Sequence, residues 1–367
     1  MSIITAYSTK TLPEAVADLK AQAGRCTPCL VLCFASSKYD PFTLSREMQA
    51  AFPGASVVGC STAGEIVGDK MLTDSVVAMF LDAEVVADVA VAVLQDVRGG
   101  DGVGQAFAEF ERHFQAPVSS LDIQKYIGLI LVDGLSGAEE GLMEKIGDRT
   151  DIFFVGGSAG DDLKFKATHV LANGKAYTNA AVLVLLQAKK GFEILKTQSF
   201  KSTGKCLLAT QADENLRKVV QFNHKPALEA YAEALGVPSA EAATLFMQYP
   251  LGLMAGKEPF VRSPQRVEDG CMYFYCKIKQ GMELQVLQAT DIVADTRAAL
   301  EAKKAEMGHV SGVIDFHCIL RTLQLRNEHR CAEYGAIFAG IPAVGFSTYG
   351  EEYLGHINQT STMLLFK

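Results

Sequence analysis

The stretch Val58-Gly59-Cys60-Ser61-Thr62-Ala63-Gly64-Glu65 decides the fold, because its pattern recurs at two later places in the sequence. The second copy is Val155-Gly156-Gly157-Ser158-Ala159-Gly160-Asp161, and the third is Val344-Gly345-Phe346-Ser347-Thr348-Tyr349-Gly350-Glu351. Each copy follows an apolar run and a segment with helical spacing, and each precedes another apolar run. Short apolar runs are typical of buried strands. Few copies at an irregular period indicate a duplicated α/β unit and not a solenoid.

The same order of elements is expected in all three units. It comprises a strand (30–35, 127–132, 313–320), a helix (42–52, 138–146, 328–338), the glycine motif and a second strand (76–81, 181–186, 361–366). Other predictions are helices at 104–114, 213–235 and 291–307 and a hairpin at 191–210. Strands this apolar need cover on both faces. We therefore predict the α/β class, with two related α/β halves whose mixed sheets pack against each other under outer helices. The halves are expected at residues 1–212 and 213–367.

Composition narrows the class of protein. The chain has 367 residues, of which 49% are hydrophobic, and a net charge of -8. This acidic balance argues against a nucleic-acid partner, and no apolar run approaches the roughly 18 residues of a membrane span. The start, Met1-Ser2-Ile3-Ile4, shows no secretory signal. The nine scattered cysteines fit reduced thiols, so a cytoplasmic location is expected.

Three cysteines near the first predicted strand form a candidate metal or redox site. Cys26 and Cys29 have the two-residue spacing that lets both sulfurs reach one metal, and Cys33 follows inside the strand. Zinc takes about four ligands, so another residue, such as Cys60, would have to complete the site. The other interpretation is a turn entering a strand with incidental thiols.

The glycine motifs are candidates for binding but not for catalysis. They lack the Lys-Ser/Thr pair of a phosphate-binding loop, and acids stand in its place at Glu65, Asp161 and Glu351. Either the glycines serve strand-end bends, or the three turns lie side by side and line a cleft for a neutral or apolar ligand. We find no nucleophile–base set in the sequence, so the prediction is a protein that is not an enzyme.

Polar residues of the third unit are candidates for a ligand pocket. Strand alternation predicts Asp315, His317 and Arg321 on one face, where they line either a pocket or a solvated edge. His356 is expected at a junction between a loop and the last strand, where a side chain can face a cleft. The remaining histidines, His169 among them, are expected at the surface.

These motifs together resemble the FIST family, a sensory module with an N-terminal and a C-terminal part. The resemblance is carried by residues 57–65 and 154–162 and, in the C-terminal half, by residues 226–231, 249–252, 262–263, 318–321, 345–351 and 356–360. It covers nearly the whole chain. The family implies a role in signal transduction.

Within the family, the chain is similar to the bacterial nitric oxide-sensing proteins (NosP). That similarity implies haem b bound through a histidine, nitric oxide as the gas ligand, and a partner histidine kinase or cyclic-di-GMP enzyme. His317 and His356 are the candidate haem ligands, with Arg321, Phe346 and Tyr349 beside them. Further residues of an apolar pocket wall would be Phe316, Tyr353, Leu253 and Met254. The alternative is a haem-free module that binds a small metabolite, such as an amino acid, or acts as an adaptor. The oligomeric state, homo-oligomers included, stays open.

Overall fold

The computed structural model describes residues 2–100, 102–256 and 258–367. The chain forms two compact units. Unit 1 comprises Met1–Thr197, Thr296–His356 and Ser361–Lys367, and unit 2 comprises Gln198–Asp295 and Ile357–Thr360. Unit 1 contains all three glycine motifs. Within the described residues, no helix combines the length and the apolar character needed to cross a membrane.

Three six-stranded sheets build unit 1, and each contains one copy of the repeat. Sheet 1 has the order β1 (Ile3–Ser8), β6 (Val76–Leu81), β2 (Leu30–Ser36), β3 (Ser56–Thr62), β10 (Val170–Ala172), β11 (Lys175–Tyr177). Sheet 2 has the order β25 (His356–Ile357), β24 (Glu351–Tyr353), β9 (Phe154–Ser158), β8 (Tyr126–Val132), β12 (Ala180–Ala188), β7 (Val86–Gln95). Sheet 3 has the order β13 (Phe192–Gln198), β26 (Thr360–Phe366), β22 (Gly312–Cys318), β23 (Ala343–Thr348), β4 (Glu65–Val67), β5 (Lys70–Leu72). Each sheet contains a parallel pair (β2–β3, β8–β9 or β22–β23) beside antiparallel neighbours.

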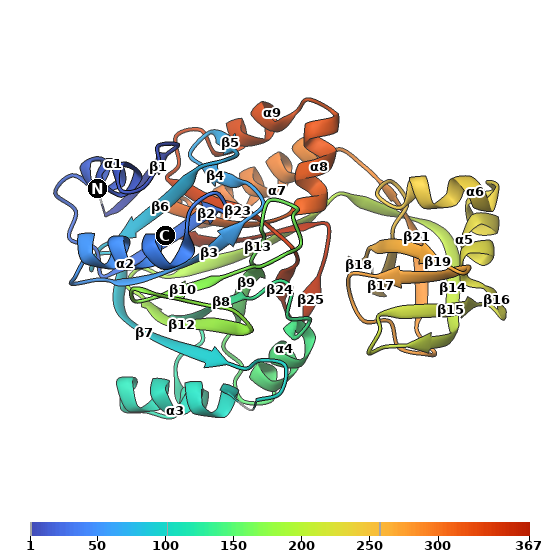
Figure 1. Ribbon diagram of the computed structural model, residues 1–367, viewed down its shortest axis with the longest axis horizontal. Helices are drawn as coiled ribbons and strands as arrows, with labels where there is room; N and C mark the ends of the chain where they lie inside the picture. The colour runs from blue at the N-terminus through green and yellow to red at the C-terminus, as the bar shows by residue number, and fades with distance from the viewer. Residues whose placement is uncertain (1, 101, 257) are drawn as a thin grey trace. The chain divides into compact units, whose positions relative to one another are not determined.

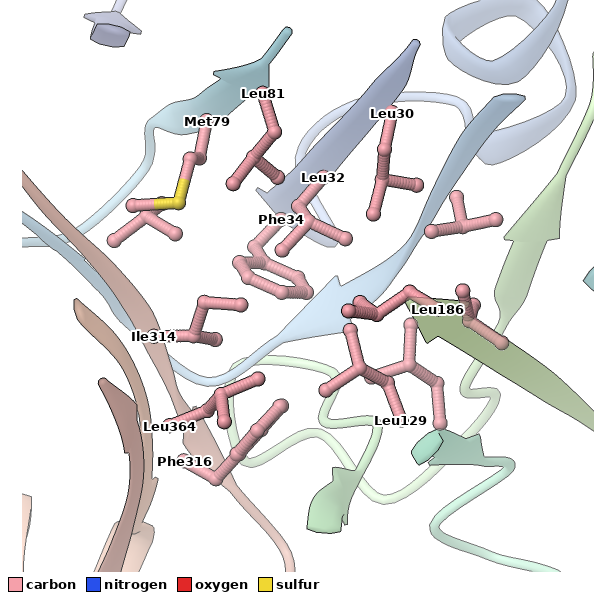
Figure 2. Close-up of a cluster of buried hydrophobic side chains, with 14 of the residues drawn as sticks. Leu30, Leu32, Phe34, Met79, Leu81, Leu129, Leu186, Ile314, Phe316 and Leu364 are labelled. Carbon is pink, nitrogen blue, oxygen red and sulfur yellow. The ribbon is translucent and has the colours of Figure 1, made fainter. Parts of the chain in front are cut away.

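The three sheets share one apolar core. Alternation along β2 places Leu30, Leu32 and Phe34 in this core, and it places Val31 and Cys33 on the opposite face. Sheet 2 contributes residues such as Leu129 and Leu186, and sheet 3 contributes residues such as Ile314, Phe316 and Leu364 (Figure 2). The predicted packing of sheet against sheet is confirmed.

Helices cover the outer faces of these sheets (Figure 1). Helices α1 (Glu14–Ala23) and α2 (Pro41–Ala51) pack on sheet 1, and α3 (Gly102–Phe114) and α4 (Glu139–Gly147) pack on sheet 2. The other helical segments of unit 1 are η1 (Val118–Ser120), α8 (Ile319–Asn327), α9 (Cys331–Gly335) and η3 (Ala336–Phe338). Helix α7 (Ile292–Met307) begins in unit 2 and continues in unit 1. The α/β class is thus confirmed.

Unit 2 has its own sheet and its own core. The sheet runs β18 (Glu258–Arg262), β17 (Leu251–Ala255), β21 (Glu283–Ala289), β14 (Phe200–Asp213), β15 (Lys218–Phe222), β20 (Cys271–Phe274), β19 (Pro264–Glu268), with β16 (Lys225–Pro226) beside β15. Helices α5 (Ala227–Leu235) and α6 (Ser239–Ala242) and the segment η2 (Ala243–Leu245) complete it. The boundary predicted at residue 212 lies within β14.

One predicted element is wrong, and two others form with different bounds. The hairpin at 191–210 does not form, because β13 pairs in sheet 3 and β14 pairs with β21 and β15. The helix at 213–235 is a helix only from Ala227, because residues 218–222 form β15. In the third unit the strand ends at Cys318 and a helix begins at Ile319, so Arg321 lies on α8 and not on the strand.

Candidate functional site

The three glycine motifs meet inside unit 1. Each pair of copies shares main-chain hydrogen bonds, namely Gly160 N to Ser61 O at 2.9 Å, Ser347 N to Gly64 O at 2.7 Å, and Tyr349 N to Ser158 O at 3.0 Å. The second and third copies also pair as strands, with Glu351 opposite Gly157. The three turns thus lie side by side, as one of the two interpretations of the motifs expected; the cleft for a neutral or apolar ligand that went with it stays a prediction.

The first glycine of each motif has the same structural role. In the parallel strand pairs, Gly59 lies beside Cys33, Gly156 beside Ile130, and Gly345 beside Asp315. A Cβ atom at these glycines would lie 1.7, 1.7 and 2.2 Å from the carbonyl oxygens of those three neighbours. Side chains are therefore excluded by backbone, which explains why the repeat keeps a glycine at this position.

The acids that follow the first and third motifs are buried and bonded to their own turns. Thr62 Oγ1 donates to Glu65, and Thr348 Oγ1 donates to Glu351. Glu65 also accepts from Ser75 Oγ at 2.6 Å. Burial raises the pKa of Glu65 to about 7, although its hydrogen bonds oppose the shift. These acids hold the turns together and do not project towards a ligand.

Asp161, at the end of the second motif, organises the loop that follows it. Its carboxylate accepts hydrogen bonds from the backbone amides of Phe165 at 2.8 Å and Lys166 at 2.6 Å, and from Tyr349 Oη at 2.6 Å. Burial alone would raise the pKa of Asp161, but these hydrogen bonds outweigh it and lower the pKa. Tyr349 therefore lies at the candidate site as a support for this loop.

A second acid fastens the same loop to the end of β2. Asp162 Oδ2 accepts from Ser36 Oγ at 2.9 Å and from Ser37 N at 2.8 Å. Lys164 Nζ donates to Ser37 Oγ at 2.7 Å and lies 3.8 Å from the Asp162 carboxylate. The loop is thus held over the carboxyl ends of β2 and β3.

A cavity of about 210 Å³ lies beneath this loop. Its lining combines two lysines, an imidazole, hydroxyl groups and a carboxylate that is already bonded; the residues are Ser37, Tyr39, Pro41, Ser61, Asp161, Lys164, Lys166, Ala167 and His169. Burial lowers the pKa of His169, so its ring is neutral near pH 7. The ring contacts the exposed side chain of Phe42, with centroids 5.7 Å apart. In α/β sheets, ligands bind at the carboxyl ends of parallel strands, which is where this cavity lies.

Sequence reasoning missed most of this cavity. His169 was expected at the surface but is half-buried and lines the cavity. Lys164 and Lys166 belong to no motif that the sequence analysis identified. The one usable signal was their position directly after the second glycine motif. A loop that follows a strand end in a repeated α/β unit is a common place for a ligand.

The predicted group Asp315, His317 and Arg321 does come together, in a fully buried cluster. Tyr334 Oη donates to Asp315 Oδ2 at 3.0 Å and lies 2.9 Å from His317 Nδ1. Because Tyr334 has one hydroxyl proton, His317 Nδ1 carries a proton and donates it to the phenol oxygen. Arg321 Nη2 donates to Thr296 Oγ1 at 2.8 Å.

Two polar groups of this cluster keep unused hydrogen-bonding capacity. Among the described residues, His317 Nε2 and Arg321 Nε and Nη1 have no hydrogen-bond partner. Burial, and then the charge of Arg321, lower the pKa of His317 far below its ordinary value, so the ring is neutral. Burial raises the pKa of Asp315 to about 6. The solvated edge, which was one interpretation of this strand, is therefore wrong.

The remaining predicted haem residues lie in packed interior. His356 is buried, its Nδ1 lies 3.3 Å from Glu352 Oε1, and a Cβ atom on Gly350 would lie 2.0 Å from its ring. Phe346 is a core residue, with its ring 4.6 Å from that of Phe34. Phe316 lies in the same core, whereas Leu253 and Met254 belong to unit 2.

A haem would need a cavity beside one of these histidines. The cavities described among residues 2–100, 102–256 and 258–367 are lined by neither His317 nor His356. His317 has a suitable bare nitrogen, but both imidazoles are enclosed by side chains. The residues do not fit a haem in this conformation.

The predicted cysteine site is not assembled either. Cys29 packs towards the shared core, with its Sγ 3.3 Å from Leu81 O, whereas Cys26 and Cys33 pack on the other face of sheet 1. Burial raises the pKa of Cys33 to about 12 and also raises the pKa of Cys60 well above its ordinary value. No group of three or more histidines, cysteines or acids in the described part of the chain is arranged to hold a metal ion.

Comparison with known proteins gives two family matches. The FIST N domain matches residues 29–225, and the FIST C domain matches residues 227–353. An uncharacterized protein of Methanocaldococcus jannaschii is 24% identical over 278 residues, which cover 71% of this chain and 53% of the relative. The chain thus spans about half the length of this relative.

Proposed function

This chain belongs to the family of proteins with FIST N and FIST C domains, which are sensory modules of signalling systems, and from that premise we propose that it senses a small polar metabolite. The ligand would carry a carboxylate, with amino acids as the first class to test, and would bind in the cavity beside His169. We propose no catalytic step. The chain would act in the cytoplasm and control a partner histidine kinase or cyclic-di-GMP enzyme.

The cavity under the Asp161 loop is the observation that supports this proposal. Lys166 supplies positive charge for a carboxylate, and Lys164 adds to it while its Nζ also donates to Ser37 and lies 3.8 Å from Asp162. Neutral His169 can donate or accept a hydrogen bond. A water molecule takes about 30 Å³ in the liquid, so a cavity of about 210 Å³ suits a molecule of amino-acid size.

The position of the cavity also suits a sensor. Its walls come from the first and second repeats, and Tyr349 of the third repeat bonds the same loop. A ligand that favours one arrangement of this loop shifts the population of states that a partner can contact.

A thermal-shift screen of amino acids and small carboxylates, followed by calorimetry of the hits, tests the proposal. A ligand at 100 times its dissociation constant stabilises the folded state by about 2.7 kcal/mol. Lys164→Met should weaken binding at least tenfold, whereas Lys20→Met, on the exposed side of α1, should not. Hits that bind both variants equally would place the ligand elsewhere, and a screen without hits would remove the proposal.

Haem-based nitric oxide sensing is the second candidate function. It is favoured by His317, whose Nδ1 is bonded to Tyr334 while Nε2 stays bare, as the histidine ligand of a metal requires. It ranks second because the enclosed ring leaves no space for the macrocycle. A visible absorption spectrum of protein produced with haem available distinguishes haem-based sensing from metabolite sensing. A stoichiometric Soret band that shifts with nitric oxide and is lost in His317→Ala would reverse the ranking.

A further inference from the structure

A second and larger hollow in unit 1 shares no lining residue with the cavity beside His169. Its volume is about 990 Å³. Its walls come from the start of β7, the segment just before β8, the end of β12 and the start of β13, together with Phe153 just before β9 and Tyr353 at the end of β24. We name it the lysine groove after four of its lining residues, Lys125, Lys189, Lys190 and Lys367.

The charge of the lysine groove is opposite to that of the whole chain. Its lining holds four lysines and one acid, Glu193, while the chain carries a net charge of -8. Glu193 is already paired, with Lys303 and Lys367 each 3.6 Å from its carboxylate. Lys125 and Lys189 also form ion pairs, at 3.4 Å with Asp122 and at 2.8 Å with Glu84, but these side chains are exposed, and exposed pairs contribute little stability. The carboxylates of an acidic partner can therefore replace these acids at the lysines.

Apolar side chains line the same groove. Ile123 is 50% exposed and Phe153 is 39% exposed, and both line this groove, so they belong to one apolar patch. The rings of Phe153 and Tyr353 stack with centroids 6.3 Å apart and planes 19° apart. Together they offer a flat apolar surface next to the lysines.

An edge strand runs along this groove. In the order of sheet 3, β13 is the terminal strand, and its residues Phe192, Glu193 and Ile194 line the groove. A terminal strand presents backbone N–H and C=O groups that can pair with another chain. Extended peptides bind many proteins by adding a strand to such an edge, with pockets for alternate side chains.

From this juxtaposition we propose that the lysine groove binds an extended acidic segment of a partner protein, which adds as a strand beside β13. The carboxylates of the segment pair with Lys125, Lys189 and Lys190, and an alternate apolar side chain packs on Phe153 and Tyr353. Binding here does not require a ligand in the cavity beside His169, so the two proposals fail separately.

The probe is a labelled eight-residue peptide in which glutamates alternate with valines and phenylalanines. Its binding to the full chain is measured by fluorescence anisotropy. The acidic peptide should bind, and a peptide with lysines in place of the glutamates should not. Methylation of every second backbone nitrogen of the acidic peptide removes its hydrogen bonds to the edge strand but keeps its charge. This change should weaken binding at least tenfold. The double variant Lys189→Glu/Lys190→Glu should cause a similar loss, and Lys20→Glu should cause none.

Three results would overturn the proposal. Equal binding of the methylated peptide would exclude strand addition, and unchanged binding by the double variant would exclude the groove. Absence of binding by the acidic peptide would leave the lysines with the protective role that they have on many edge strands, where they discourage pairing with other chains.

Discussion

Tyr349 Oη donates a hydrogen bond of 2.6 Å to Asp161 Oδ1 and thereby joins the third glycine motif to the second across 188 residues of sequence. The same phenol oxygen accepts from Leu163 N at 2.9 Å. Burial, and then the bond to Asp161, raise the pKa of Tyr349 above its ordinary value, so the phenol stays protonated as a donor. One side chain of the third repeat thus fixes the loop over the cavity.

Tyr349→Phe should lower the free energy of unfolding by about 1–3 kcal/mol, because it removes a donor from a buried carboxylate. It should also weaken ligand binding in the cavity, since Lys164 and His169 are on the loop that Asp161 organises. Urea unfolding and calorimetry measure the two effects. Tyr177→Phe is the control, because the Tyr177 hydroxyl has no described hydrogen bond. Equal losses in both variants would assign the effect to packing.

Substitution of the first motif glycines should be costly in all three repeats. Gly59→Ala, Gly156→Ala and Gly345→Ala each force a Cβ atom against a carbonyl oxygen of the neighbouring parallel strand. Overpacking of this kind typically costs about 1–3 kcal/mol and sometimes more, and here backbone must move. Denaturant midpoints in circular dichroism give the measurement.

Gly141→Ala is the matched control for the glycine series. Gly141 lies in α4 with nothing within 4 Å of the added methyl group. In a helix, alanine is favoured over glycine by about 1 kcal/mol, so this variant should be neutral or more stable. If one motif glycine tolerated alanine as well as Gly141 does, the three repeats would not share this packing.

The repeat could be predicted from sequence because each unit carries its own local pattern. The apolar runs at 76–81, 127–132 and 361–366 and the glycine motifs between strands mark the elements to within two residues. The side-by-side arrangement of the motifs was one of two interpretations of the repeat, and the sequence alone could not decide between them. Local order and periodicity were enough to predict the elements of the repeat.

Other features depend on partners that are distant in sequence. β13 and β14 alternate like a hairpin, yet β13 pairs with β26 and β14 with β21, which lie far along the chain. His317 and His356 looked like ligands because exposure is not visible in a sequence, and tertiary packing encloses both. The cavity depends on a loop held by Asp161 and Asp162, whose hydrogen-bond partners only the fold brings together.

Thiol labelling should separate the nine cysteines by burial. Cys206 is exposed and should react first with a thiol reagent, and Cys26 and Cys29, which are partly buried, should follow. Cys33 and Cys60 should react only on unfolding, because burial excludes the reagent and raises their pKa. Mass spectrometry of labelled peptides identifies each site. A zinc site at Cys26, Cys29 and Cys33 would instead show joint protection of these three thiols that a chelator removes.

The buried Glu65 should make the protein less stable as pH rises through the weakly acidic range. Its pKa is raised by burial to about 7 in the folded state, against an ordinary value of 4.5. Between these values the folded state binds more protons at this site than the unfolded state, so the free energy of unfolding falls as pH increases. A shift of this size corresponds to a loss on the order of 3 kcal/mol between about pH 4.5 and pH 7.

Glu65→Gln tests this assignment, because the amide keeps the shape but does not titrate. Urea midpoints at pH 5 and pH 7.5 should differ less in this variant than in the parent chain. Glu109→Gln, on the exposed face of α3, should leave the parent pH dependence unchanged. An identical pH slope in the parent and in Glu65→Gln would mean that Glu65 is ionised in the folded state at pH 5. Its hydrogen bonds from Thr62 and Ser75 would then outweigh the cost of burying the charge.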